Sequence, residues 1–300
     1  MDSRYLQSLI VVIDRGSIAE AARVEQLTAA AISQRINALE REFGFELLSR
    51  IGHSAKPTQA CLNILPRARR IVKEFELLAG DNDPTGLSGT LKIGAISTAL
   101  TGLLPSAMRS LANKAPSIKL EIIPGASQFL YEAVVSGDLD AAILVAPPFA
   151  LPKLIKASSL RKEALVFLSK NKPEAGLAEM LRHRPYLRYM PETWGGRHAA
   201  AYLHDHGLAN TPMCDLDALE TIAILVADDV GVSLVPHWPN LEKLAQSCYL
   251  TPIEDERYHR EVILICKLQT TRPNMIAALT HALMESPVAS LRTSNSNTLV

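Results

Sequence analysis

The sequence lacks the features that mark a membrane protein. Its longest apolar runs, such as Ala141 to Ala146 and Ile222 to Ala227, fall far short of the roughly 20 residues that cross a bilayer. Asp2 and Arg4 interrupt the apolar residues near the start, so the sequence predicts no secretory signal peptide. We therefore expect a protein of the cytoplasm that has no membrane partner.

Cysteine is scarce and catalytic motifs are missing. The four cysteines, Cys61, Cys214, Cys248 and Cys266, are widely spaced without a C-x-x-C pair. This spacing favours reduced thiols over a disulfide framework or a metal site, with a redox pair of Cys214 and Cys248 as the alternative. No G-x-S-x-G, H-E-x-x-H, P-loop or G-x-G-x-x-G pattern occurs, so we expect no catalytic residue and no cofactor.

Net charge is also lacking, since 31 basic residues balance 31 acidic residues over the chain. The distribution is uneven, however. Residues 1–73 carry eleven arginines and lysines against seven acidic residues, a modest positive field that suits contact with phosphates. A solvated helical surface is the alternative explanation for this excess.

The first 58 residues have the pattern of three helices. Apolar residues recur at helical spacing between Leu6 and Ile13, and Gly16 is expected to end the first helix. Ser17 and Glu20 match a capping box at the start of the second helix. Thr28 then begins a third helix, which has one apolar face and one polar face.

The polar face at the start of the third helix has residue types that contact DNA. Gln34 and Asn37 on this face carry the donor and acceptor pairs that read adenine in the major groove. Residues 45–58 then predict a wing, with Arg50 and Lys56 beside a tip at His53, where they would reach the backbone or the minor groove. A plain three-helix bundle is the alternative. The predicted DNA-binding residues are Thr28, Ala29, Ala30, Ser33, Gln34, Asn37, Arg50, His53 and Lys56.

A long amphipathic helix follows the wing. Apolar residues repeat every three or four positions from Thr58 to Leu78, and Gly80 is expected to end this helix. Pro66 lies within the repeat, where it should kink the helix or leave one backbone hydrogen bond unmade. The apolar face needs a partner, which is either the helix's own domain or a second copy of the chain. Because two-fold symmetric proteins read two half-sites on DNA, we favour a dimer.

From Leu91 onward, short apolar strands alternate with helices, which predicts parallel strands joined by crossover helices. Two such sets predict a two-lobed α/β domain, crossed near Ser159 to Lys162 and near Cys266 to Leu268. The strand EVILICKL and the helix after it are expected to return to the first lobe. Ligands in such folds bind between the lobes, at the carboxyl ends of strands. The predicted effector-binding residues are Ser97, Thr98, Ser127, Pro147, Arg197, Asp217 and His237.

Several of these residues have a structural alternative. Ser97 and Thr98 precede a helix, and they either cap it or hold an anionic ligand. Arg197 either clamps a carboxylate or is an ordinary surface residue. Trp238 and Tyr189 either stack on a ligand ring or fill the core, and we favour the core.

The chain resembles the LysR-type transcriptional regulators over nearly its full length. The N-terminal match runs through GSIAEAARVEQLTAAAISQRINALEREFGFELLSR and then PTQACLNILPRARRIV. The sequence departs from the family at residues 28–30, Thr-Ala-Ala in place of the common Ser-Gln-Pro, and at Cys61, where glycine is usual. Alanine touches a thymine methyl but forms no side-chain hydrogen bond, which shifts the expected specificity to Ser33, Gln34 and Asn37.

The resemblance implies an activator or repressor of transcription that is controlled by a small, anionic effector between two lobes. It also implies homodimers or homotetramers on double-stranded DNA, with RNA polymerase as a further partner. The implied parts are a winged helix-turn-helix (1–58), a linker helix and hinge (59–89) and a periplasmic-binding-protein-like α/β effector domain (90–300; lobe I 90–161 and 267–290, lobe II 162–266). A solute-binding protein and a two-lobed enzyme are the alternatives, which the N-terminal helices and the missing catalytic motifs respectively disfavour.

Overall fold

The computed structural model of the chain describes residues 2–51, 54–78, 83–174, 176–208 and 211–285. The chain forms two compact units, one of residues 1–86 with 136–138 and one of residues 87–135 with 139–300. Within the described ranges, no helix is both long enough and apolar enough to span a membrane.

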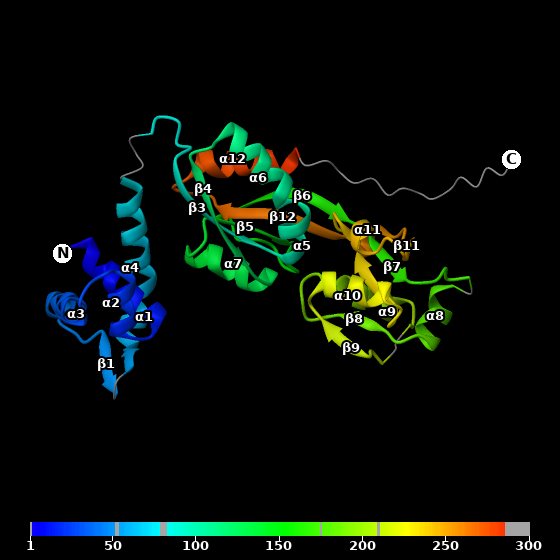
Figure 1. Cartoon of the computed structure of the whole chain (residues 1–300), viewed down its shortest axis with the longest axis horizontal. Coiled ribbons are helices and arrows are strands. Elements are labelled where there is room, and N and C mark those ends of the chain that lie inside the picture. The colour runs from blue at the N-terminus through cyan, green and yellow to red at the C-terminus, as the bar shows by residue number, and fades with distance from the viewer. Residues whose placement is uncertain (1, 52–53, 79–82, 175, 209–210, 286–300) are drawn as a thin grey trace. The chain divides into compact units, whose positions relative to one another are not determined.

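The N-terminal unit contains short helices, a two-stranded wing and one long helix (Figure 1). Its elements are α1 (Ser3–Arg15), α2 (Ile18–Val24), α3 (Ala29–Phe43), β1 (Leu48–Ile51), β2 (Ser54–Pro57) and α4 (Gln59–Leu78). The wing strands are antiparallel, with Ser49 opposite Lys56. Buried side chains from all four helices form a single core, so the predicted winged helix-turn-helix is present.

Local capping signals explain where the first helices begin and end. Gly16 and Gly44 follow α1 and α3 with φ of 73° and 78°, a left-handed conformation that glycine adopts without steric cost. Ser17 Oγ accepts a hydrogen bond from the backbone N–H of Glu20 at 3.1 Å. The predicted capping box is only half formed, since the Glu20 carboxylate accepts a hydrogen bond from Arg23 instead.

Helix α4 packs on its own unit along one face and exposes apolar side chains elsewhere. Cys61, Ala68 and Val72 are buried in the core of the unit, and Pro66 lies inside the helix as predicted. The exposed apolar side chains of α4 are Leu62, Ile71 and Phe75, with exposed fractions of 45%, 40% and 59%. Packing on its own domain therefore uses only part of the apolar surface. Gly80, predicted to end the helix, lies outside the described residues.

The second unit begins with a five-stranded sheet in the order β4-β3-β5-β12-β6. Strands β4, β3 and β5 are parallel, and β12 is antiparallel to both β5 and β6. Figure 1 shows α6 and α12 on one face of this sheet and α7 on the other. The elements of this lobe are β3 (Gly89–Ala95), α5 (Ser97–Gly102), α6 (Leu104–Lys114), β4 (Ile118–Pro124), α7 (Ser127–Ser136), β5 (Ala141–Val145), β6 (Ile155–Glu163), β12 (Arg260–Lys267) and α12 (Pro273–Met284).

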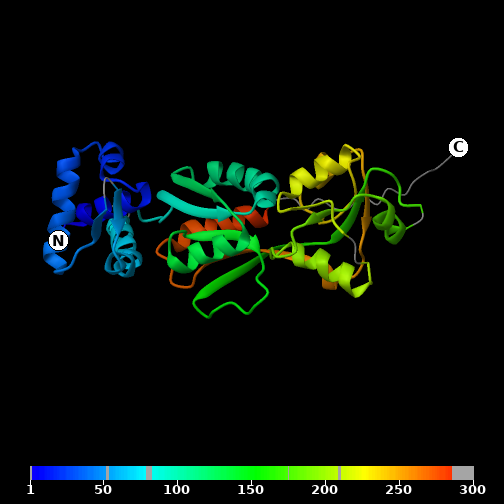
Figure 2. The same cartoon turned by 90° about the horizontal axis from the view of Figure 1, so that it is seen from below.

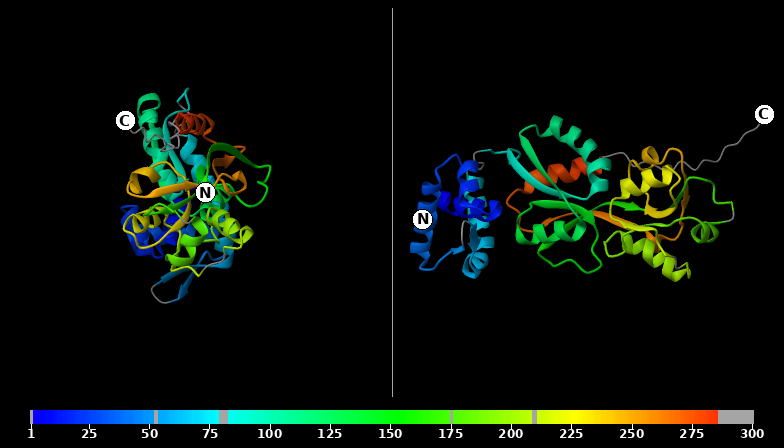
Figure 3. Two further views of the ribbon diagram at one scale, coloured as in Figure 1. Left: turned by 90° about the vertical axis from the view of Figure 1, so that its right-hand side faces the viewer. Right: turned by 60° about the horizontal axis from the view of Figure 1, so that its bottom comes forward.

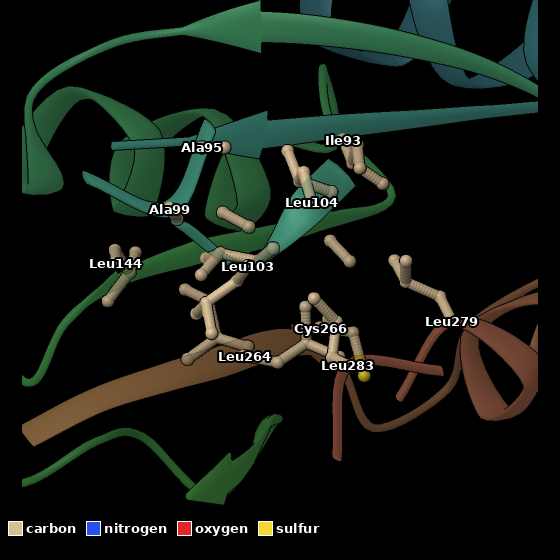
Figure 4. Packing of buried hydrophobic residues seen from close by; sticks show 14 of the residues in the cluster. Ile93, Ala95, Ala99, Leu103, Leu104, Leu144, Leu264, Cys266, Leu279 and Leu283 are labelled. Carbon is tan, nitrogen blue, oxygen red and sulfur yellow. The ribbon is translucent and has the colours of Figure 1, made fainter. Parts of the chain in front are cut away.

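The core of this first lobe is almost wholly aliphatic. Figure 4 shows Leu103 and Leu104, at the junction of α5 and α6, pointing toward side chains of the sheet and of α12. Every residue of β5 is buried, as expected for a strand covered by helices on both faces. This rigid layer fixes the carboxyl ends of β3, β4 and β5.

The second lobe is built around two smaller sheets, one of order β10-β7-β11 and one that pairs β8 with β9. Strands β8 and β9 are parallel, but β10 and β11 are both antiparallel to β7. The prediction of parallel strands throughout is therefore wrong for this lobe. Its elements are β7 (Leu165–Ser169), α8 (Leu177–His183), β8 (Leu187–Tyr189), α9 (Gly196–Asp205), β9 (Cys214–Leu216), α10 (Leu219–Ala227), β10 (Ser233–Pro236), α11 (Leu241–Leu244), β11 (Tyr249–Pro252) and the 3-10 turn η1 (Glu256–Tyr258).

The two lobes are joined by the paired strands β6 and β12, which run together toward the second lobe (Figures 2 and 3). Glu163 pairs with Arg260 at one end of this ladder, and Ile155 pairs with Lys267 at the other. Because all of β12 belongs to the first sheet, the chain returns to the first lobe before Arg260. The expected return of EVILICKL to the first lobe is confirmed. The expected second crossing near Cys266 to Leu268 is wrong by about six residues, because it was placed at the end of this strand instead of at its start.

Candidate functional site

The N-terminal unit presents its predicted contact residues on the surface of α3. Thr28, Ala29, Ala30, Gln34 and Asn37 are exposed and Ser33 is half-buried. The opposite face of the helix is anchored in the core through Ile32, Ile36 and Leu39. Thr28 Oγ1 accepts a hydrogen bond from the backbone N–H of Ala31 at 3.1 Å, so this threonine also caps the helix.

A partly buried polar cluster holds α3 against the first two helices. Arg35 of α3 donates to Glu25 Oε2 at 2.8 Å and to Ser8 Oγ at 2.9 Å. The Ser8 hydroxyl in turn donates to the same Glu25 oxygen at 2.8 Å. Because Ser8 belongs to α1 and Glu25 follows α2, the three residues fix the angle at which α3 is presented.

The start of the wing is tied to α3 by Glu40. Its Oε1 atom accepts hydrogen bonds from the backbone N–H groups of Leu47 at 2.7 Å and Leu48 at 3.2 Å. Lys56 is exposed on β2. Arg50 lies on β1, but its side chain and all of His53 are outside the described residues. Helix α3 thus both carries the predicted contact residues and positions the start of the wing.

The second unit contains a cavity of about 310 Å³ between its two lobes. The first lobe contributes residues at the carboxyl ends of β3, β4 and β5, and the second lobe contributes residues that follow β8 and β9. The lining residues are Ile96, Ser97, Thr98, Leu100, Pro124, Gly125, Ala126, Ser127, Val145, Tyr189, Thr193, Gly195, Asp217, Ala218, Leu219 and Arg260. Four of the seven predicted effector-binding residues, Ser97, Thr98, Ser127 and Asp217, therefore meet in one place.

Arg260 forms part of the cavity wall as a buried, ion-paired cation. Its Nε atom donates to Glu163 Oε2 at 2.7 Å, and the two side chains are only 2% and 1% exposed. Its Nη2 atom donates to Thr98 Oγ1 at 3.0 Å, and its Nη1 atom lies 3.5 Å from the Tyr189 hydroxyl. Burial alone lowers the pKa of Arg260, but the charges of Glu163 and Tyr189 and the hydrogen bonds to both residues together more than offset this and raise it. The arginine thus links both lobes at the point where the chain crosses between them.

Three predicted effector residues do not line this cavity. Arg197 is half-buried, and its Nη2 atom donates to the backbone oxygen of Ala146 at 3.3 Å, across the two lobes. His237 is buried, with Nε2 3.3 Å from Glu242 Oε1. Pro147 is half-buried in the loop after β5. Pro147 and His237 follow closely after β5 and β10, and Arg197 lies at the start of α9. These places between strands and helices did not bring their side chains to the cavity.

The structure gives different answers for Trp238 and Tyr189, which were each expected either to fill the core or to stack on a ligand. Trp238 is 1% exposed in the core of the second lobe, as favoured from the sequence. Tyr189 belongs to the same core and also lines the cavity. Trp194 packs against Tyr131 and Phe149 of the first lobe, with ring centroids 5.8 Å and 5.6 Å away.

Sequence reasoning missed Arg260, the second charged residue of the cavity lining, and its buried partner Glu163. Arg260 begins the buried strand REVILICK, and Glu163 comes just before the buried strand LVFLS. A charge of each sign beside a long apolar strand is a usable signal, because a buried charge needs a partner. The sequence does not reveal that these two positions are opposite each other in one ladder.

The four cysteines are free thiols, and the predicted alternative pair of Cys214 and Cys248 forms no disulfide in the structure. Burial raises the pKa of the Cys248 thiol, which disfavours the reactive thiolate. The pKa of Cys61 is raised to about 11, chiefly by burial.

Comparison with known protein families agrees with both halves of this description. Residues 3–62 match the bacterial regulatory helix-turn-helix protein model of the lysR family, and residues 84–287 match the LysR substrate binding domain model. The chain belongs to the LysR family. It is therefore a DNA-binding transcription regulator with an effector-binding domain, and the family is one of regulators rather than enzymes.

Individual LysR-type proteins are similar over most of the chain. The transcriptional regulator CzcR of Bacillus cereus is 29% identical over 237 residues, which cover 79% of this chain and 80% of that protein. Full-length OxyR from Pseudomonas aeruginosa superposes with a TM-score of 0.71 at 21% identity, covering 95% of both chains. CbnR in complex with its target DNA gives a TM-score of 0.63 at 20% identity, covering 96% of this chain and all of CbnR. These structures share the fold.

Proposed function

We propose that this LysR-type regulator reads DNA with the exposed start of α3 and is controlled by a small polar effector held in the cavity between its lobes. The observation that carries the proposal is the cavity itself. It is lined from both lobes, so an occupant contacts both and favours one relative orientation of the lobes over others. The volume of about 310 Å³ lies at the small end of typical ligand pockets, which fits a metabolite.

On the DNA side, the proposed base-reading residues are Ser33, Gln34 and Asn37, because they are the polar side chains on the outward face of the helix start. Ala29 and Ala30 would contact a thymine methyl. Thr28 and the wing residues Arg50, His53 and Lys56 would contact phosphates or the minor groove.

The proposed assembly is a homodimer, or a homotetramer built from two such dimers. It is supported by the apolar side chains that α4 leaves exposed, Leu62, Ile71 and Phe75, since such a surface is normally covered by a partner. Two copies would place two recognition helices on neighbouring half-sites. The regulator would act in the cytoplasm, with RNA polymerase as a further partner at the promoter.

The test is binding of the full chain to the DNA upstream of its own gene, measured against random DNA of the same length at rising salt. We expect site-specific binding to persist at salt concentrations that remove random binding, because base contacts add to the salt-sensitive phosphate contacts. A metabolite that fills the cavity should then change the affinity or the length of DNA protected. Equal loss of both DNAs at every salt concentration would contradict the DNA half of the proposal.

A further inference from the structure

The charges in the cavity are not all matched by protein partners. Two of its lining residues are charged, Arg260 and Asp217. Arg260 is satisfied by Glu163, Thr98 and Tyr189. In contrast, no hydrogen bond or ion pair within the described residues reaches the Asp217 carboxylate. The arginine is therefore part of the wall, whereas the aspartate is available to a ligand.

Asp217 also has no structural task that would explain it. It lies two residues before α10, whose N-cap residue is Ala218, and no side chain caps that helix. Asp217 is an exposed residue that lines the cavity. Partial burial raises the pKa of its carboxylate against a smaller lowering by Arg260, and a cationic ligand group would favour its charged form.

The opposite wall offers hydrogen-bond donors. Ser127 Oγ accepts from the backbone N–H of Val145 at 3.1 Å, and Thr98 Oγ1 accepts from Arg260 at 3.0 Å. Besides the bond that its oxygen accepts, each hydroxyl has one proton that it can donate to a ligand in the cavity. The first lobe thus suits a ligand group that accepts hydrogen bonds, such as a carboxylate.

We propose that the effector is a small amino-carboxylate zwitterion, whose ammonium group is bound by Asp217 and whose carboxylate is bound by the hydroxyls of Thr98 and Ser127. The two ends of the ligand then hold different lobes, because Asp217 belongs to the second lobe and both hydroxyls belong to the first. This assignment rests on the proposed function of the cavity as the effector site. It keeps the anionic group expected from the sequence and adds a cationic one.

The experiment measures thermal stabilisation of the full chain by the twenty protein α-amino acids. Each amino acid that stabilises the chain is compared with its carboxylic acid lacking the amino group and with its amine lacking the carboxylate. We expect at least one amino acid to bind, with both halves binding roughly 10- to 100-fold more weakly, as loss of a charged hydrogen bond implies.

Asp217→Asn is the decisive variant, and Asp228→Asn at the other end of α10 is its matched control. We expect Asp217→Asn to weaken the amino acid by roughly 10- to 100-fold and to leave the affinity for the deaminated acid unchanged. The control should bind both compounds like the unmodified chain. Melting without ligand checks that each variant folds.

Other outcomes separate this inference from the proposed function. If no amino acid binds, or if the deaminated acid binds as tightly as the amino acid, the zwitterion assignment is wrong. Should simple carboxylates or sugars then stabilise the chain and alter its DNA binding, the cavity is still an effector site. If no compound of any charge class binds, both proposals fail.

Discussion

The two units of this regulator build their contact surfaces in opposite ways. In the N-terminal unit, one face of α3 is buried and holds the fold, while the other face, which we propose reads DNA, is exposed. In the second unit, Arg260 both holds the fold, through its buried pair with Glu163, and forms the wall of the ligand cavity. Stability and recognition are therefore separable on α3 but shared in the cavity. Four measurements test this difference between the two units.

The largest effect is expected from Arg260→Met. This change leaves Glu163 buried without a partner, which typically costs about 3 to 5 kcal/mol of unfolding free energy, and it removes the donor to Thr98. The measurement is urea unfolding followed by tryptophan fluorescence, since both tryptophans of the chain lie in the second unit. Arg257→Met, at an exposed pair with Asp255, is the control and should change little. Equally small losses of unfolding free energy in the two variants would show that Arg260 does not hold the fold.

A drop in pH should weaken the second unit through His198. Burial, aided by the charges of Arg197 and Arg260, lowers the pKa of His198 to about 4 from its ordinary 6.5. In the unfolded chain His198 therefore binds a proton near pH 6.5, whereas in the folded chain it stays neutral until about pH 4. The free energy of unfolding therefore falls as the pH drops from 6.5 toward 4. The loss is about 2 to 3 kcal/mol by linkage. The check is the same unfolding measurement across this range, in which His198→Gln should give a flatter profile than the unmodified chain.

Gln34→Ala tests whether DNA recognition by α3 is separate from the stability of the fold. Removal of a bidentate base contact should cost about 1 to 3 kcal/mol of specific DNA-binding free energy. Thermal unfolding should not change, because the side chain is exposed. The matched control is Gln128→Ala, an exposed glutamine of the second unit that bonds only Glu132. Unchanged affinity for the specific site would clear Gln34 of base readout.

The smallest effect is expected from Ser17→Ala, which removes the hydrogen bond to the backbone of Glu20. Loss of a helix cap typically costs about 1 kcal/mol, and the cost should appear in the unfolding of the N-terminal unit, followed by circular dichroism. Discrimination between specific and random DNA should stay the same once the protein is folded. A change in base preference would show that α2 helps to read DNA.

The N-terminal unit was readable from the sequence because its signals are local. Gly16, Ser17, Thr28 and Gly44 each fix a helix end within a few residues, and the three-to-four-residue periodicity of α3 shows which face is buried. The winged helix-turn-helix was therefore placed correctly, and Thr28, Ala29, Ala30, Gln34 and Asn37 are exposed on it as expected. The missing half of the capping box is a small exception, since Glu20 has a second partner, Arg23, within reach.

The cavity was only partly readable because it is assembled from distant segments. Four residues were found by assuming that ligands meet strand ends, and the same assumption also gave Pro147, Arg197 and His237, which lie elsewhere. Strand direction in the second lobe and the register of β6 with β12 depend on long-range pairing that no local pattern encodes. Arg260 could not be placed in the cavity without that register.

The pairing of Glu163 with Arg260 makes the second lobe a topological insertion. The chain leaves the first sheet after one member of this pair and re-enters it at the other, so the 96 intervening positions interrupt what is otherwise an antiparallel hairpin. A short turn in their place would close β6 onto β12 without disturbing the ladder that follows. The first lobe thus has the connectivity of a complete domain into which the second lobe is inserted. The insertion begins and ends at the two residues of the ion pair.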